Sequence, residues 1–152
     1  VVMGGRSAST ARVTADGTLM FSGVVSFENN GGFASIRSAD GPFDLGRGAG
    51  VCVRVRGDGK RYKLSLAPRD GFDALRHQAT FDTSADGWQD IPLAFTAFEP
   101  RFRGRLVPGA TPLDPARVAH LGFVIADRQG GPFRLEIERL RPWAGPDAEC
   151  PR

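Results

Sequence analysis

Short apolar segments alternate with polar positions along most of the chain, and turn-forming residues separate them. Alternation with a period of two is typical of strands that bury one face. Strands are predicted at residues 11–15, 18–25, 33–38, 51–56, 61–66, 78–82, 89–93, 121–126 and 133–140. Asp16-Gly17 predicts a hairpin between the first two. Many short strands at this spacing favour an all-β fold, an antiparallel β-sandwich or barrel.

Helical patterns are rare. Asp114 suits a helix N-cap and Pro115 the first helical position, which predicts a short helical turn at residues 114–120. A second short turn is expected at residues 95–98. The 20 Gly and 11 Pro make up about a fifth of the 152 residues, which argues against a helical bundle.

The length and the hydrophobic content of 41% suit one domain with a real core. We place this single binding domain at residues 1–142. Residues 143–152 form a Pro-rich, polar C-terminal tail, which we expect to lie loosely on the surface.

Residues 51–66 form the clearest pattern. Asp58-Gly59 favours a two-residue hairpin turn, which would pair Val55 with Tyr62. Alternation then assigns one set of side chains to the core: Val51, Val53, Val55, Tyr62, Leu64 and Leu66. It assigns a second set to the opposite face: Cys52, Arg54, Arg56, Arg61, Lys63 and Ser65.

That opposite face would carry four cations on two paired strands: Arg54, Arg56, Arg61 and Lys63. Like charges opposite each other destabilise a sheet, so the cations need compensation. Two interpretations remain open. In one, acidic residues of neighbouring strands lie between the cations on a solvated outer face. In the other, the cations form a docking face for a partner or polar ligand, because guanidinium groups bind carboxylates and phosphates bidentately.

Polar residues near turns supply the remaining candidate binding positions at loops or rims. These are Asn29, Asn30, Arg37, Arg103, Arg105, Asp127 and Gln129. Asn29-Asn30-Gly31-Gly32 has the chemistry of a tight turn, and its amides would also suit sugar hydroxyls or a peptide backbone. Arg103 and Arg105 would either pair with an internal carboxylate such as Asp127 or face a ligand.

The charge pattern gives little sign of a nucleic-acid partner. The formal net charge is +3, and 18 of the 20 basic residues are arginine, as a GC-rich genome alone would produce. Four phenylalanines, Phe21, Phe81, Phe123 and Phe133, lie at core positions. They are therefore not interleaved with the arginines as a base-stacking surface requires, and we expect no nucleic-acid binding.

No catalytic motif is present. His77 and His120 are the only histidines, and neither lies at a metal-ligand spacing. Glu28 and Asp127 would form a glycosidase pair only if the fold brought them together. The Gly-rich residues 46–50 precede a predicted strand and do not have the spacing of a dinucleotide-binding motif. We therefore expect no enzyme activity, no cofactor and no metal.

Cys52 and Cys150 are the only cysteines. A disulfide between them remains open, although its rarity in cytosolic proteins favours two separate thiols. No apolar run reaches the length of a membrane span, and the first residues do not have the pattern of a leader segment.

The chain resembles the complex I intermediate-associated protein family. The resemblance lies in Val2-Met3-Gly4-Gly5-Arg6-Ser7 and in residues 23–35, which include Glu28-Asn29-Asn30-Gly31-Gly32-Phe33. It continues in residues 54–64, in Phe102-Arg103-Gly104-Arg105 and in residues 125–133. These blocks follow the family's order nearly from end to end.

The resemblance implies a galactose-binding-like jelly-roll β-sandwich, similar to some carbohydrate-binding modules. It also implies a chaperone-like role in assembling respiratory complex I through a protein partner, without catalysis. Eukaryotic relatives act in mitochondria, and for a bacterial member we expect the cytoplasm. The alternative is glycan recognition, as in a carbohydrate-binding module.

Overall fold

The computed structural model describes residues 8–15, 17–25, 34–40, 48–68, 76–102, 105–109, 113–115, 118–125, 131–145 and 150. Most of them lie in strands. The strands are β1 Ala8–Val13, β2 Leu19–Val25, β3 Ala34–Asp40, β4 Gly50–Arg56, β5 Arg61–Pro68, β6 Arg76–Asp82, β7 Trp88–Ala94, β8 Glu99–Phe102, β9 Arg105–Leu106, β10 Val118–Ile125 and β11 Gly131–Trp143. A short 3-10 helix, η2, spans Phe95–Ala97.

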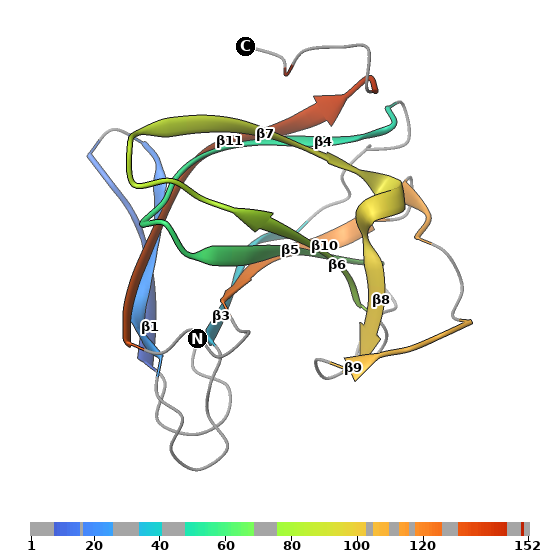
Figure 1. The fold of residues 1–152 in the computed structure, drawn as a ribbon, viewed down its shortest axis with the longest axis horizontal. Coiled ribbons are helices and arrows are strands. Elements are labelled where there is room, and N and C mark those ends of the chain that lie inside the picture. Colours follow the sequence, from blue (N-terminus) through green and yellow to red (C-terminus); the bar gives the residue numbers. More distant parts are fainter. Residues whose placement is uncertain are drawn as a thin grey trace.

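The strands form two antiparallel sheets packed face to face (Figure 1). One sheet has five strands in the order β1-β2-β11-β4-β7, and the other has six in the order β3-β10-β5-β6-β8-β9. In Figure 1 the middle of the six-stranded sheet faces β4, β7 and β11, while β3 and β8 bend away at either side. The predicted antiparallel β-sandwich is confirmed.

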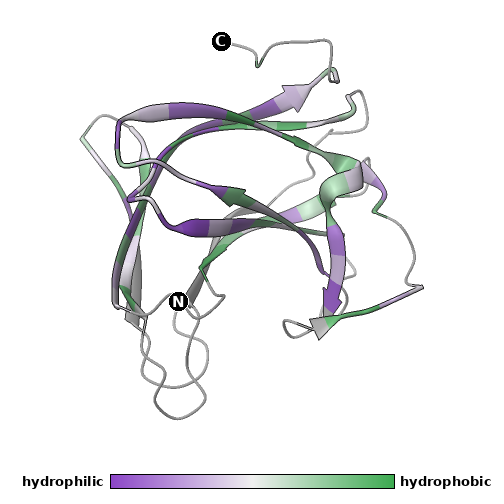
Figure 2. Ribbon diagram, viewed as in Figure 1, coloured by the Kyte–Doolittle hydropathy of each residue, from purple (hydrophilic) through white to green (hydrophobic). Residues whose placement is uncertain are grey.

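The core lies between the sheets and follows the alternation of the sequence (Figure 2). All six residues assigned to the core in residues 51–66 are completely buried, and the four phenylalanines expected there are at most 4% exposed. Phe21 on β2 contacts Phe133 on β11, with ring centroids 4.9 Å apart, and reaches across to Tyr62 on β5 at 6.5 Å. Aromatic contacts thus connect the two sheets.

Two local predictions are confirmed and a third is wrong. β1 and β2 form the expected hairpin, with Val13 opposite Leu19, and η2 is the turn expected at residues 95–98. The helical turn predicted to reach residue 120 is wrong, because β10 begins at Val118. Val118 is 1% exposed, so burial of this β-branched side chain in a sheet outweighs the local helix signal.

The hairpin predicted at residues 51–66 is also wrong. β4 pairs with β11 and β7 in the five-stranded sheet, whereas β5 pairs with β10 and β6 in the six-stranded sheet. The two strands therefore face each other across the core instead of sharing a hydrogen-bond ladder. Residues 57–60 carry the chain from one sheet to the other.

This crossover is held by polar contacts to Asp58. The Tyr62 hydroxyl donates a hydrogen bond to Asp58 Oδ1 at 2.9 Å, and the Arg134 backbone N–H donates to Asp58 Oδ2 at 2.8 Å. Burial, reinforced by the Asp58 charge, raises the pKa of Tyr62, so the hydroxyl stays a donor. Thr83 packs so closely on Gly57 that a Cβ there would lie 2.3 Å from its side chain. The Asp58-Gly59 signal therefore marks a crossover between sheets and not a hairpin.

The C-terminal segment is attached to the five-stranded sheet at two described points. β11 continues to Trp143, which is 7% exposed, and Cys150 forms a disulfide with Cys52. The two thiols favoured by the sequence are thus one bond, and the expectation of a loosely held tail is wrong at these two residues. The domain boundary at residue 142 stays a prediction.

Candidate functional site

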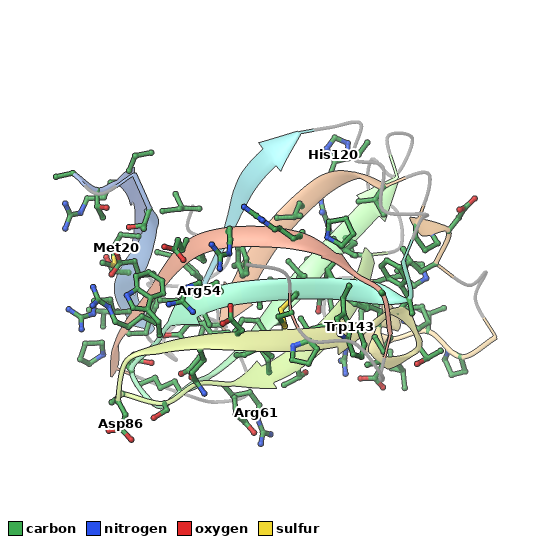
Figure 3. The ribbon with its side chains drawn as sticks, turned by 90° about the horizontal axis from the view of Figure 1, so that it is seen from above. Met20, Arg54, Arg61, Asp86, His120 and Trp143 are labelled. Atoms are coloured by element: carbon green, nitrogen blue, oxygen red, sulfur yellow. A yellow bond between two sulfur atoms is a disulfide. The ribbon has the colours of Figure 1, made fainter. Side chains whose placement is uncertain are left out.

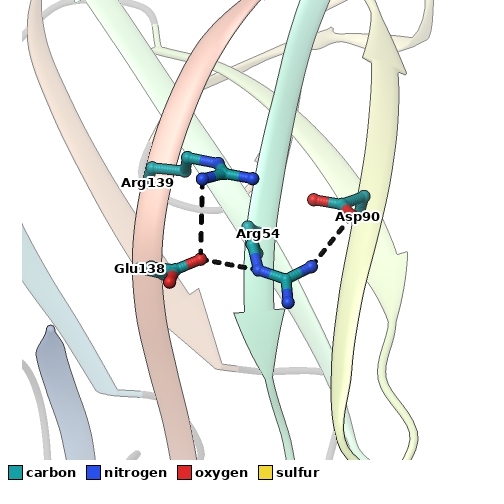
Figure 4. Close-up of a pocket in the computed structure, with 4 residues that line it drawn as sticks. All are labelled: Arg54, Asp90, Glu138 and Arg139. Atoms are coloured by element: carbon teal, nitrogen blue, oxygen red, sulfur yellow. Dashed lines mark hydrogen bonds and ion pairs between the residues drawn. The ribbon is translucent and has the colours of Figure 1, made fainter. Parts of the chain in front are cut away.

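Arg54 lies at the centre of a charged group on the outer face of the five-stranded sheet (Figures 3 and 4). Its Nη1 donates to Asp90 Oδ2 on β7 at 2.9 Å, and its Nε lies 2.6 Å from Glu138 Oε2 on β11. Arg139 Nη1 lies 3.9 Å from the same Glu138 oxygen. The four side chains line an open hollow of about 400 Å³. Pairs as exposed as these contribute only about 0–1 kcal/mol each, so they can exchange partners at low cost.

Arg56 pairs with a much more buried carboxylate. Its Nη2 donates to Glu136 Oε1 at 2.6 Å, and the Thr18 hydroxyl donates to Glu136 Oε2 at 2.5 Å. Glu136 is 4% exposed. Each oxygen of the Glu136 carboxylate accepts a hydrogen bond from one of these donors. A buried carboxylate needs such donors to be stable in its ionised form.

Trp88 lies under both guanidinium groups. The Arg56 guanidinium carbon is 4.9 Å from the Trp88 ring centroid and that of Arg54 is 5.6 Å away. Stacking of this kind contributes about 0.5–1 kcal/mol at exposed sites and aligns the cations. We call the following six residues the arginine cluster: Arg54, Arg56, Trp88, Asp90, Glu136 and Glu138.

The pKa of Glu136 is lowered from 4.5, chiefly by the Thr18 hydrogen bond and also by Arg56, against the opposing effect of burial. A carboxyl with a lower pKa in the folded state adds stability above its unfolded pKa and loses it as the pH falls through the folded value. Wild type should therefore lose free energy of unfolding as the pH falls from neutral to below about 4.5. We expect Glu136→Gln to lose less over the same range, because it has no carboxyl at this position to protonate. At pH 7 the same variant should lose about 1–3 kcal/mol, because the charge-assisted bonds are weakened.

Urea unfolding at pH 7, 5 and 3 measures this effect. Glu99→Gln is the control, because Glu99 is an exposed carboxylate paired with Arg101 on the other sheet. Parallel pH profiles for wild type and Glu136→Gln would contradict the assigned role of Glu136.

The structure divides the four cations expected on one face. Arg54 and Arg56 lie outside the five-stranded sheet, whereas Arg61 and Lys63 belong to β5 in the six-stranded sheet. The single four-cation face is therefore wrong, because β4 and β5 do not pair. Arg61 Nε lies 2.8 Å from Asp82 Oδ1 on β6, and Lys63 is 7% exposed. Acidic residues of neighbouring strands pair with Arg54, Arg56 and Arg61, as the first of the two interpretations expects.

The remaining candidate residues can be placed only in part. Arg37 lies in β3 opposite Gly122 of β10, and Arg105 lies in β9 opposite Phe102. Five others lie outside the described residues: Asn29, Asn30, Arg103, Asp127 and Gln129. Their binding roles stay predictions.

Sequence reasoning missed the residues that complete the arginine cluster. Glu136 and Glu138 lie on β11 and Asp90 on β7, between 34 and 84 positions from the arginines in the chain. Charged residues at alternate positions 134, 136 and 138 were a signal of an outer face. No local signal says that this strand lies beside β4.

Among the described residues, no three His, Cys, Asp or Glu side chains gather in a way that could hold a metal ion. Within the same residues, no helix is long and apolar enough to span a membrane.

Comparison with known families identifies the chain. Residues 1–137 match the model of the family described as Complex I intermediate-associated protein 30 (CIA30). The chain belongs to the CIA30 family. The resemblance inferred from the sequence blocks is thereby confirmed, and the match ends at Ile137, in the middle of β11.

Individual CIA30 relatives are mitochondrial proteins of modest similarity. The protein of Drosophila melanogaster is 29% identical over 157 residues, which cover 88% of this chain and 52% of that protein. The Mus musculus protein is 28% identical, over 62% of this chain and 30% of that protein. The Neurospora crassa protein is 27% identical, over 76% of this chain and 44% of that protein. The chain thus spans about half or less of the curated relatives it matches.

Solved structures with the same fold include carbohydrate-binding modules. The family 11 module of the cellulosomal cellulase Lic26A-Cel5E of Clostridium thermocellum has a TM-score of 0.60 at 16% identity, covering 91% of this chain and 82% of the module. The solution structure of CtCBM11 has a TM-score of 0.63 at 13% identity, over 94% and 85%. An agarase, AgWH50C, matches 94% of this CIA30 chain with 23% of its own length, at a TM-score of 0.57 and 11% identity. These likenesses confirm the jelly-roll sandwich.

Proposed function

We propose that this chain is a non-catalytic protein-binding domain that takes part in assembling a respiratory complex I. The observation that carries the proposal is the CIA30 match over residues 1–137, which includes both sheets. Assembly factors act by holding a partner during construction, so the chain needs a docking surface and no reacting groups.

The arginine cluster supports such a surface. Arginine and tryptophan are enriched among the residues that dominate binding energy at protein interfaces. Arg54 is held by Asp90 and Glu138, whose side chains are 39% and 40% exposed. Because these are partly solvated ion pairs, a partner carboxylate can replace one of them without leaving a buried charge unpaired. We therefore propose a partner that presents acidic side chains to this sheet.

Pull-down of host proteins by the tagged chain, with Arg54→Ala beside wild type, tests the proposal. We expect complex I subunits or their precursors to be captured, and Arg54→Ala to weaken capture by about thirtyfold, the scale of one interface hot spot. Arg61→Ala is a matched control, because Arg61 also pairs with an aspartate of the adjacent strand, at 2.8 Å, but on the opposite sheet. Equal capture by wild type and Arg54→Ala, or equal loss in both variants, would contradict this docking surface. Capture of no complex I protein by wild type would contradict the function.

Glycan recognition is the second candidate, and its support is the fold shared with a family 11 module solved in complex with a β-1,3-1,4-mixed-linked tetrasaccharide. Sugar sites commonly use an uncovered aromatic face. Trp88 is one of the described aromatic side chains that are not buried, but its ring is stacked against two guanidinium groups. The stacked face is therefore not open to a sugar. We expect no saturable binding to mixed-linked glucan by titration calorimetry. Saturable binding would favour this alternative.

A further inference from the structure

The two cysteines of the chain are 98 positions apart and form one bond, Cys52–Cys150, with Cα atoms 5.7 Å apart (Figure 3). This separation falls in the range that a disulfide bridges without backbone movement. The sequence contains no other cysteine, so neither sulfur has a competing partner within the chain.

Cys52 lies in the middle of β4 and faces outward, because Val51 and Val53 on either side are completely buried in the core. Its partners across the ladder are Arg141 on β11 and Pro92 on β7, and both are exposed. Cys52 itself is only 4% exposed. The bonded Cys150 lies on this position, so the disulfide attaches the chain beyond β11 to the outer face of the five-stranded sheet.

Strand pairing places the end of β11 beside Cys52. Trp143, at the end of β11, pairs with Gly50, two residues from Cys52. The Ala49 N–H donates to the Trp143 carbonyl oxygen at 2.8 Å and fixes this end of the strand. Cys150 comes only seven positions after Trp143, a reach of about 24 Å at most. The pairing of β11 with β4 therefore leaves only a short stretch of sequence between the end of the ladder and Cys150.

We propose that Cys52 and Cys150 are the substrate of a thiol–disulfide oxidase in an oxidising compartment, and that their bond is a redox-controlled attachment of the C-terminal segment. The oxidase disulfide accepts two electrons and two protons and becomes a dithiol, while the two thiols of this chain lose them and form the S–S bond. A dithiol reductant reverses the reaction: its thiolate attacks the sulfur of Cys150, the more exposed partner, and Cys52 leaves as a thiolate. The second thiol of the reductant then resolves the mixed disulfide and frees Cys150.

The compartment follows from the chemistry of the bond. Structural disulfides persist in the periplasm, the secretory route and other oxidising spaces, while cytosolic thiols are kept reduced by glutathione and thioredoxin. A stable bond at this position therefore argues against the bacterial cytoplasm expected from the sequence. In a reducing compartment the same residues would be two thiols, and Cys150 would no longer be bonded to β4.

Thiol trapping in the native host tests the compartment. Cells are quenched in acid and labelled with a maleimide, and the chain is digested without reductant. We expect a peptide pair linked through Cys52 and Cys150 and no maleimide on either cysteine. Two labelled cysteines in the native cells would overturn the proposal.

Variants of the purified chain test the attachment. In oxidising buffer Cys150→Ser should lower Tm by roughly 5–15 °C, the shift of one disulfide in a domain of this size. Cys150→Ser should also make the bond-free segment sensitive to limited proteolysis while the β-sheet circular dichroism persists. Adding dithiothreitol should lower the Tm of the wild type to that of Cys150→Ser and leave the Tm of the variant unchanged.

The double variant separates the bond from local packing. If the bond carries the effect, Cys52→Ser with Cys150→Ser should be no less stable than Cys52→Ser alone. Additive losses, or a wild-type Tm that dithiothreitol does not change, would overturn the proposed attachment.

Discussion

Replacing Phe21 by alanine is expected to lower the free energy of unfolding by about 3–5 kcal/mol, the cost of removing a fully buried aromatic ring. Phe21 is completely buried and contacts Phe133 within its own sheet and Tyr62 of the opposite sheet. Its removal leaves a cavity between the two sheets that the surrounding strands cannot close without breaking ladder hydrogen bonds. A domain is usually stable by only about 5–15 kcal/mol, so a sizeable part of that stability should be lost.

Urea unfolding followed by circular dichroism measures the loss. Phe95→Ala is the control, because Phe95 lies at the margin of the core in η2 and is only partly buried. We expect Phe95→Ala to lower the free energy of unfolding by less than half as much as Phe21→Ala. A Phe21→Ala variant as stable as Phe95→Ala would show that the aromatic contacts between the sheets contribute little.

Gly50→Ala is expected to destabilise the chain by at least about 3 kcal/mol, at the upper end of the cost of overpacking. A Cβ at Gly50 would lie 2.2 Å from the Leu93 carbonyl oxygen and 2.8 Å from Ala94 Cα. Both contacts are backbone atoms of β7, which cannot rotate away as a side chain would. The ladder between β4 and β7 must therefore open at this end, where the Phe95 N–H donates to the Ala49 carbonyl oxygen at 2.9 Å.

Hydrogen exchange identifies where the damage falls, since the Phe95 amide should lose its protection before the centre of β4 does. Gly109→Ala is the control, because Gly109 has φ +73° and no atom within 4 Å of an added Cβ. That variant should cost only about 1–2 kcal/mol, the strain of a left-handed residue. Equal losses in the two variants would mean that the close approach of β4 and β7 does not constrain position 50.

Alternation predicts the faces of the strands well because it is a local property. Val51, Val53, Val55, Tyr62, Leu64 and Leu66 are all buried as expected. The same alternation does not say whether two successive strands share a ladder or face each other across the core, since both arrangements bury the same side chains. The pairing of β4 with β5 was wrong for this reason.

The arginine cluster depends on those long-range neighbours and was only half predictable. Arg54 and Arg56 were correctly expected on an outer face, and the need for acidic compensation followed from their charge. Which carboxylates supply it depends on β7 and β11 flanking β4. The disulfide was equally out of reach, because the two cysteines are 98 positions apart and the sequence carries no local sign that they meet.

The place of β11 in the five-stranded sheet has a consequence for synthesis on the ribosome. β11 alone joins the pair β1-β2 to the pair β4-β7, through ladders to β2 on one side and β4 on the other. A nascent chain grows by about 5–20 residues per second from its N-terminus. Until residues 131–143 have left the exit tunnel, two strand pairs therefore wait with the facing edges of β2 and β4 unpaired. Open strand edges recruit other chains, so the edges of β2 and β4 are where a nascent chain is exposed to pairing with another chain until β11 is available.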